Sequence, residues 1–146
     1  MQMTKDELRE ILNGTKPLQL ADYDLSKADL NQVDLSKADL SGADLNGAFL
    51  DKARLRYANL SNANLEGADL SEANFHGAIL IEADLSDTKL QDADLSGAKL
   101  NNANLSYANL TGANMSGADV NGVKYNSYTH WPVGFDPAEA GAILLE

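Results

Sequence analysis

The sequence contains no cysteine, and histidine is nearly absent. The lack of cysteine excludes disulfide bonds, cysteine nucleophiles and cysteine-ligated zinc. The two histidines, His76 and His130, lie far apart, and neither has a partner at a metal-ligand spacing. We therefore predict no metal site. We interpret His76 as a solvated surface residue and His130 as part of a C-terminal cap.

Long apolar runs and basic residues are also scarce. No run is long enough for a transmembrane helix, and the N-terminus MQMTKDELREILNG lacks the basic start and apolar segment of a secretory signal. The 11 Lys and Arg residues oppose 22 Asp and Glu residues, which gives a net charge of -11. This balance disfavours direct binding to nucleic acid and to membranes, because both require clustered positive charge. We expect a cytoplasmic protein.

The chain is rich instead in one five-residue repeat. An apolar residue, usually leucine, occupies every fifth position from Leu20 to Tyr125, and alanine usually precedes it by two positions. A straight strand would point successive central residues to opposite faces, and an α-helix would rotate them by about 140° per repeat. Neither element keeps them together. The pattern therefore predicts a chain that changes direction at each repeat and stacks its coils in a solenoid.

The repeat A-(D/N)-L-x-x, as in ADLSGADLNGAFL and ANLSNANLEGADL, resembles the pentapeptide-repeat family. The resemblance covers roughly residues 18–127. It implies an all-β solenoid, a right-handed quadrilateral β-helix of about 5.5 coils with four repeats per coil. Residues twenty apart would then stack. The structural core would include Leu40, Leu60, Leu80 and Leu100.

The segments outside the repeats are expected to cap the solenoid with short helices. We divide the chain into an N-terminal helical cap (1–17), the β-helix (18–127) and a C-terminal cap or tail (128–146). Thr4 and Glu7 indicate a capping box for a helix over about residues 5–12. Asp136 and Pro137 signal a second helix start. The residues expected to cover the ends are Leu8, Ile11, Leu12, Trp131 and Phe135.

The tail leaves a second interpretation open. Its segment THWPVGFDPAEAGA resembles tails of short family members from photosynthetic bacteria. Instead of capping the rod, the tail would form a dimer contact through Ile143, Leu144 and Leu145. We therefore expect either a monomer or an end-to-end dimer.

No catalytic constellation is present in the sequence. A bore filled with leucine and alanine predicts no internal pocket, and the many carboxylates are expected on a convex, solvated surface. The segment DYDLSKADL lacks the central glycine and terminal glutamate of a calcium loop. We predict no catalytic residue, no cofactor and no enzyme activity.

One stretch, GAFLDKARLRYANL (residues 47–60), departs from the repeat. Apolar or basic residues stand there at positions that are otherwise short and polar. Stacking at intervals of twenty would place Arg56 beside His76 and Tyr57 beside Gly77, and two isoleucines of the next coil should point outward. The alternative is drift, because single exposed apolar residues are normal. The candidate interaction surface consists of Phe49, Arg54, Arg56, Tyr57, His76, Ile79 and Ile81.

Two functions remain open from the sequence. The first is a non-enzymatic structural or protein-interaction module that binds an unidentified protein partner through its outer faces or ends. The second is implied by the resemblance: an acidic rod that mimics DNA and binds a type II topoisomerase such as gyrase. We expect any break in the regular stacking first at Thr88, which stands where alanine is usual.

Overall fold

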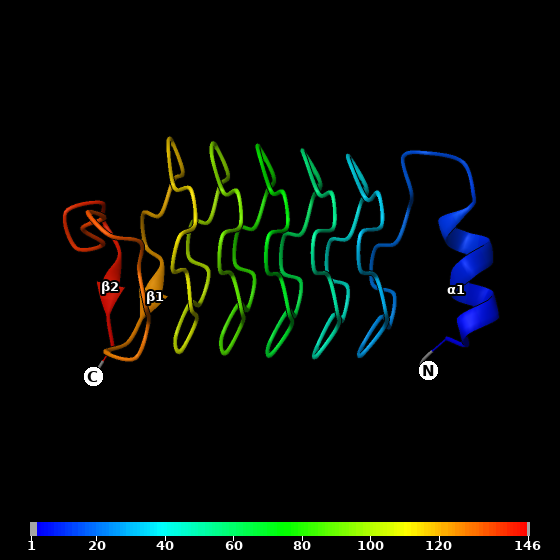
Figure 1. Ribbon diagram of the computed structural model, residues 1–146, viewed down its shortest axis with the longest axis horizontal. Helices are drawn as coiled ribbons and strands as arrows, with labels where there is room; N and C mark the ends of the chain where they lie inside the picture. Colours follow the sequence, from blue (N-terminus) through cyan, green and yellow to red (C-terminus); the bar gives the residue numbers. More distant parts are fainter. Residues whose placement is uncertain (1–2, 146) are drawn as a thin grey trace.

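The computed structural model describes residues 3–145. Helix α1 (Lys5–Leu12) is followed by coils that stack along one axis, so that α1 and the C-terminal strands lie at opposite ends of the rod (Figure 1). Within the described range, regular strands are limited to β1 (Lys124–Tyr125) and β2 (Ile143–Leu144), which pair in parallel. The other coils are joined by isolated parallel bridges between residues twenty apart, from Gln19↔Asp39 to Asn104↔Lys124. Each such coil therefore contains four repeats.

The four repeats of a coil form four faces, which we number in chain order. The first face is built on Leu20, Leu40, Leu60, Leu80, Leu100 and Val120, and the second on Leu25, Leu45, Leu65, Leu85, Leu105 and Tyr125. The third is built on Leu30, Leu50, Leu70, Leu90 and Leu110, and the fourth on Leu35, Leu55, Phe75, Leu95 and Met115. The central side chains from Leu20 to Val120 are buried. Each buried leucine contributes roughly 1.5–3 kcal/mol before the entropy of ordering is subtracted.

A regular repeat leaves no backbone N–H without an acceptor, as residues 58–62 show. Asn59, Leu60 and Asn62 donate to carbonyls of the adjacent coils over 2.9, 2.7 and 3.0 Å. Ala58 N–H closes the preceding turn on the Leu55 carbonyl at 3.1 Å. The remaining N–H, that of Ser61, donates to the side-chain Oδ1 of Asn59 at 3.0 Å. Where Asp or Asn precedes the central residue, its side-chain oxygen is therefore an acceptor for the turn.

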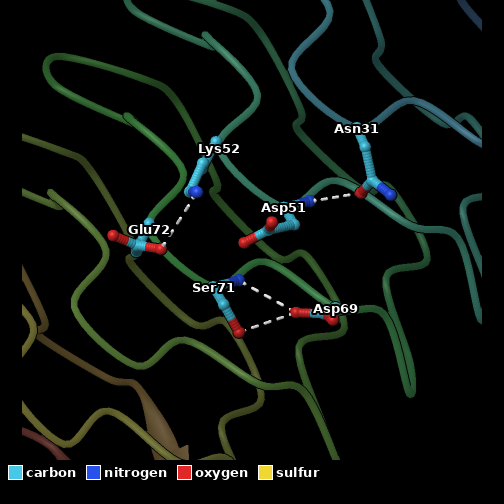
Figure 2. Close-up of polar contacts among 6 residues, drawn as sticks. All are labelled: Asn31, Asp51, Lys52, Asp69, Ser71 and Glu72. Atoms are coloured by element: carbon cyan, nitrogen blue, oxygen red, sulfur yellow. Dashed lines mark hydrogen bonds and ion pairs between the residues drawn. The ribbon is translucent and has the colours of Figure 1, made fainter.

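Figure 2 shows this side-chain acceptor on the third face and its replacement one coil earlier. Asp69 Oδ1 accepts from the N–H of Ser71 at 3.1 Å and from its hydroxyl at 2.7 Å. Phe49 stands at the equivalent position and has no acceptor to offer. The N–H of Asp51 donates instead to Oδ1 of Asn31, in the preceding coil, at 2.8 Å. At this position a neighbouring coil thus supplies the missing acceptor.

The N-terminal helix lies against the first coil. The Thr4 hydroxyl accepts from the N–H of Glu7 at 3.2 Å, and Oε2 of Glu7 accepts from the N–H of Thr4 at 2.7 Å. This reciprocal pair fixes the start of α1. Leu8 is buried, and Ile11 and Leu12 are half-buried against the core. The apolar stripe of α1 therefore packs on the end of the coil stack.

At the other end the period of five breaks down between β1 and β2. His130 pairs with Asn109, a spacing of 21 residues, whereas Ile143 pairs with Lys124, a spacing of 19. Between these points Trp131 stacks on Phe135, with ring centroids 5.1 Å apart. Both aromatic residues are half-buried against the core.

Two expectations for the C-terminal half are wrong. Residues 137–141 form turns rather than a helix, although the Ala140 N–H reaches the Asp136 carbonyl at 3.1 Å. Gly141 adopts a φ of 98°, which ends this single turn, and β2 then gains backbone bonds by pairing with β1. Thr88 does not break the stacking, because Lys89 still pairs with Asn109 at the regular spacing of twenty. The buried Thr88 hydroxyl donates at 2.7 Å to the Leu85 carbonyl, the acceptor that an alanine N–H uses in regular repeats.

Among the described residues, no helix has the length and apolar character needed to cross a membrane.

The aspartates before the central residues should make stability depend on pH in the acid range. The hydroxyl and N–H of Ser41 hold the pKa of Asp39 below its ordinary value of 3.8, and Asp24 and Asp34 show the same lowering through their serines. A carboxyl whose pKa is depressed on folding stabilises the protein above its unfolded pKa, and this contribution is lost as pH falls through the folded value.

We therefore predict that the urea midpoint of unfolding is constant between about pH 6 and about pH 5 and falls below about pH 3.8. The triple variant Asp24→Asn, Asp34→Asn, Asp39→Asn retains the acceptor oxygen, as Asn59 does in the native chain, and should show a shallower decline. An equally steep decline in this variant would contradict the assignment.

Candidate interaction surface

The fourth face carries an aromatic cluster built around Tyr57. The Tyr57 ring meets the His76 ring edge-on, with centroids 5.5 Å apart and an interplanar angle of 80°. The Arg56 guanidinium carbon lies 5.7 Å from the Tyr57 ring centroid, within the range of a cation–π contact. A Cβ atom at Gly77 would collide with the Tyr57 ring, so the glycine provides the space in which the ring lies. Periodicity placed these neighbours correctly, with Tyr57 next to Gly77 and Arg56 on the same face as His76.

His76 is not the freely solvated residue that its position suggested. It is half-buried, and its Nδ1 lies 2.8 Å from the Ser96 hydroxyl. That hydroxyl donates its proton to Oδ1 of Asp94 at 2.6 Å, so His76 Nδ1 must be the donor to Ser96. We call Arg56, Tyr57, His76, Ser96 and Asp94 the Tyr57 cluster. Ser96 and Asp94 were not among the residues predicted from the sequence, although Ser96 lies twenty residues after His76 and Asp94 lies forty residues after Arg54.

The order of these groups has a chemical consequence. The Ser96 hydroxyl donates to a carboxylate and not to the imidazole, so His76 is not placed to remove its proton as a base would in nucleophilic catalysis. Burial raises the pKa of Asp94, but the hydroxyl and N–H of Ser96 outweigh it and hold the pKa below the ordinary value. Asp94 is thus an ionised anchor that fixes the His76 ring against Tyr57.

The two arginines of the fourth face differ in their surroundings. Arg54 lies 3.9 Å from Asp34, which makes an exposed and weak ion pair. Within the described chain, no ion pair holds the Arg56 guanidinium, and no acceptor binds the Arg56 backbone N–H. The Arg56 N–H lacks an acceptor because Arg54 stands where Asp or Asn normally supplies one.

The structure does not bring all seven candidate residues together. Phe49 is 49% exposed but lies on the third face, where it lines a groove beside α1 with Leu12, Ala28 and Val33. Ile79 and Ile81, which we expected to point outward as exposed residues, lie on the first face and are half-buried. Their neighbours along the face, including the residues that pair with Ile79 on both sides, cover part of their surface. Arg54, Arg56, Tyr57 and His76 remain as one surface.

Charge is distributed unevenly around the rod. Basic residues outnumber acidic ones on the fourth face, with Lys37, Arg54 and Arg56 against Asp34 and Asp94. The other three faces are acidic. The acidic residues there are Asp22, Asp39, Glu82 and Asp119 on the first face, Asp24, Asp44, Glu66, Asp84 and Asp87 on the second, and Asp29, Asp51, Asp69, Glu72 and Asp92 on the third. The Tyr57 cluster therefore lies on the one repeat face whose charge is reversed. No group of three or more potential metal ligands occurs among the described residues.

The family model "Pentapeptide repeats" (8 copies) matches residues 19–56, 50–87, 58–97 and 88–124. These matches cover most of the chain, which belongs to the pentapeptide-repeat family. Pentapeptide-repeat proteins form right-handed quadrilateral β-helices and are generally non-enzymatic structural or interaction modules. No catalytic family is indicated.

Two solved structures of pentapeptide repeat proteins are similar to this chain in sequence. Rfr23, a pentapeptide repeat protein from the cyanobacterium Cyanothece 51142, is 40% identical with a TM-score of 0.56, over 68% of this chain and 64% of that protein. The chain thus matches less than two thirds of the length of Rfr23. The pentapeptide repeat protein alr5209 from Nostoc PCC 7120 is 33% identical over 97% of this chain and 96% of its own, with a TM-score of 0.44.

A more distant structure shares the fold alone. QnrB1, a plasmid-mediated fluoroquinolone resistance protein, is 19% identical with a TM-score of 0.61, over 88% of this chain and 77% of that chain. No curated protein sequence matches the chain.

The packing of Tyr57 on Gly77 predicts a specific pair of stability effects. Gly97→Ala should cost about 1–2 kcal/mol, because its φ of 66° is unfavourable for alanine while its Cβ would meet nothing closer than 3.8 Å. Gly77→Ala has a similar φ of 67° and must also displace the Tyr57 ring, so it should cost more. In a Tyr57→Gly background this excess should vanish, as measured by urea unfolding. Equal costs for the two alanine variants in the native background would argue against the contact.

Proposed function

We propose that this protein is a non-enzymatic interaction module that binds a protein partner through the Tyr57 cluster and Arg54. The main support for this proposal is that arginine, tyrosine and histidine side chains are already held together on the one basic face of the repeats. Tyrosine and arginine dominate the binding energy of many protein interfaces. Because these side chains are ordered before binding, less side-chain entropy is lost on association.

The remainder of the chain acts in this proposal as a rigid support. We infer a rod of about 5.5 coils over residues 18–127, closed by residues 1–17 and by the tail 128–146. The proposal leaves the cluster accessible in a monomer. It is also compatible with an end-to-end dimer, since Ile143, Leu144 and Leu145 are 52%, 51% and 41% exposed at the far end of the rod from α1.

The double variant Arg56→Ser, Tyr57→Gly tests this function. It should fold normally, because Tyr57 has a φ of 58° that glycine adopts without strain. We predict that its affinity for a partner captured by the wild-type protein falls by about tenfold or more, because the cation–π pair and the aromatic contact are lost together. Titration calorimetry or biolayer interferometry with the captured partner gives the measurement.

Tyr107→Gly is the matched control. Tyr107 is 53% exposed, close to the 52% of Tyr57, has a φ of 63° and stacks on Tyr128 on another part of the rod. Its replacement should leave binding unchanged. Normal folding with unchanged affinity in the Tyr57 double variant, or equal loss in the control, would overturn the assignment to the fourth face.

A second candidate function is DNA mimicry toward a type II topoisomerase such as gyrase. The observation that favours it is the continuous acidity of three faces in a chain with a net charge of -11. The basic fourth face argues against it, because a duplex presents negative charge on all sides.

A gyrase supercoiling assay decides this point. Mimicry predicts inhibition or protection at micromolar protein, weakened by the triple variant Asp24→Asn, Asp44→Asn, Asp84→Asn, which removes charge from the second face and keeps the acceptor oxygens. Absence of any effect of the wild-type protein would exclude the mimic.

A further inference from the structure

We infer that the fourth face binds a carboxylate-rich, extended segment of its partner, with Arg56 as the anchor. This inference rests on the proposed function and specifies the chemistry of the partner. Two observations together favour a carboxylate: the open backbone donor of Arg56 lies on the same residue as a guanidinium without an ion pair in the described chain, and the charge of this face is reversed.

The open donor is a consequence of the repeat pattern. In regular repeats of the fourth face an Asp or Asn oxygen accepts the N–H two residues later, as Asn74 does for His76 at 2.9 Å and Asp94 for Ser96 at 2.9 Å. Arg54 has no oxygen to offer, and the N–H of Arg56 has no acceptor in the described chain. An acceptor from outside the chain would complete the turn.

The solenoid satisfies this kind of donor at some positions only. After Ile79, Lys89 and Lys99, which also lack the acceptor oxygen, the N–H groups of residues 81, 91 and 101 have no acceptor in the described chain. On the third face, the N–H of Asp51 finds Asn31 one coil earlier. The residue in the same relation to Arg56 is Ser36, and no bond joins them in the described structure. Arg56 therefore presents its N–H and its unpaired guanidinium on the same exposed residue, and both favour an anionic oxygen.

The surroundings favour a carboxylate segment over a nucleic acid. Lys37, Arg54 and Arg56 lie on two successive coils, joined by the bond from Lys37 N–H to the Arg56 carbonyl at 2.9 Å. The acidic faces on both sides would repel a long polyanion, whereas a short segment confined to these two coils of the fourth face meets three basic residues and one acidic residue, Asp34. The glycine column that begins at Gly77 continues through Gly97 and Gly117, where a Cβ at Gly117 would meet only the Gly97 backbone. This edge leaves space for an extended chain beside Tyr57.

Nuclear magnetic resonance titration of the 146-residue chain with synthetic peptides tests the inference. The probe is a peptide of alternating glutamate and glycine, and the control peptide replaces glutamate with glutamine. We expect saturable amide shifts at Arg56, Tyr57 and His76 with the glutamate peptide only, the Arg56 amide moving downfield as it gains an acceptor. Affinity should fall by about tenfold between about 0.05 and about 0.5 M salt, because exposed charge pairs are screened.

Two substitutions at Arg54 separate the charge from the open donor. Arg54→Gln removes the charge but leaves the vacancy, since Gln19 occupies the same repeat position and the Ala21 N–H has no acceptor in the described chain. Arg54→Asn removes the charge and restores the acceptor seen at Asn74. We expect about threefold weaker peptide binding for Arg54→Gln and about tenfold weaker binding for Arg54→Asn. Lys99→Gln, which removes a basic residue from the first face, should have no effect.

The outcomes distinguish this inference from the proposed function. Equal effects of the two Arg54 variants, or shifts located on another face, would overturn the role of the open donor. Suppose that the glutamate peptide does not bind, while the Arg56→Ser, Tyr57→Gly variant still loses its captured partner. The proposed binding surface then stands, and the inference that the partner segment is acidic is wrong. If the peptide does not bind and partner capture is also unchanged, both proposals fail. If the protein self-associates in a salt-sensitive way and Arg56→Ser abolishes this association, the partner of the fourth face is a second copy of this chain. That result would overturn the inference of a separate acidic segment.

Discussion

The structure depends on one constraint: every five residues the backbone must turn a corner without leaving a buried or crowded N–H unpaired. Three N–H groups of each repeat reach adjacent coils, one closes the turn, and the last depends on the Asp or Asn oxygen before the central residue. Leucine at the centre fills the bore, and alanine allows the sides to converge. The repeat A-(D/N)-L-x-x thus provides both the hydrogen-bond acceptor that the turn needs and the side chains that pack the bore.

The repeat assigns packing and hydrogen bonding to some positions and leaves others free to vary. The fold can therefore carry a binding surface with little loss of stability. Core positions and the turn acceptor are constrained, whereas the two turn residues face outward. The second of them adopts positive φ whether it is Gly77 or Tyr57. A bulky side chain at that position is tolerated when the next coil supplies a glycine, as Gly77 does for Tyr57 and Gly42 does for Asp22. The Tyr57 cluster therefore belongs to the surface and not to the support.

Periodicity alone could predict which residues stack, because a spacing of twenty follows from four repeats per coil. It placed Tyr57 beside Gly77 and identified the leucine core. It could not predict the chain of bonds from His76 through Ser96 to Asp94, which depends on side-chain rotamers across two coils. It placed Phe49 on the preceding face, but it could not predict the groove that Phe49 lines beside α1, because the position of α1 is set by packing outside the repeats.

The C-terminal segment shows a different limit of local sequence signals. Asp136 and Pro137 are sound indicators of a helix start, and one helical bond forms there. The pairing of β2 with β1 prevails because it extends a ladder that is already in place, and Gly141 permits the necessary change of direction. A long-range backbone partner thus overrides a local preference that is worth about one turn of helix.

The break in spacing at this end, 21 residues and then 19, has a consequence for how such a rod changes length. Within the repeats, duplication or deletion of a twenty-residue block preserves every stacking relation on either side of it. The last coil, with its spacings of 21 and 19 residues, cannot stack in place of a regular coil. It therefore stays at the end of the rod when regular coils are added or lost. Rod length can therefore drift during evolution independently of both ends, and a recognition feature confined to two or three coils is carried along intact.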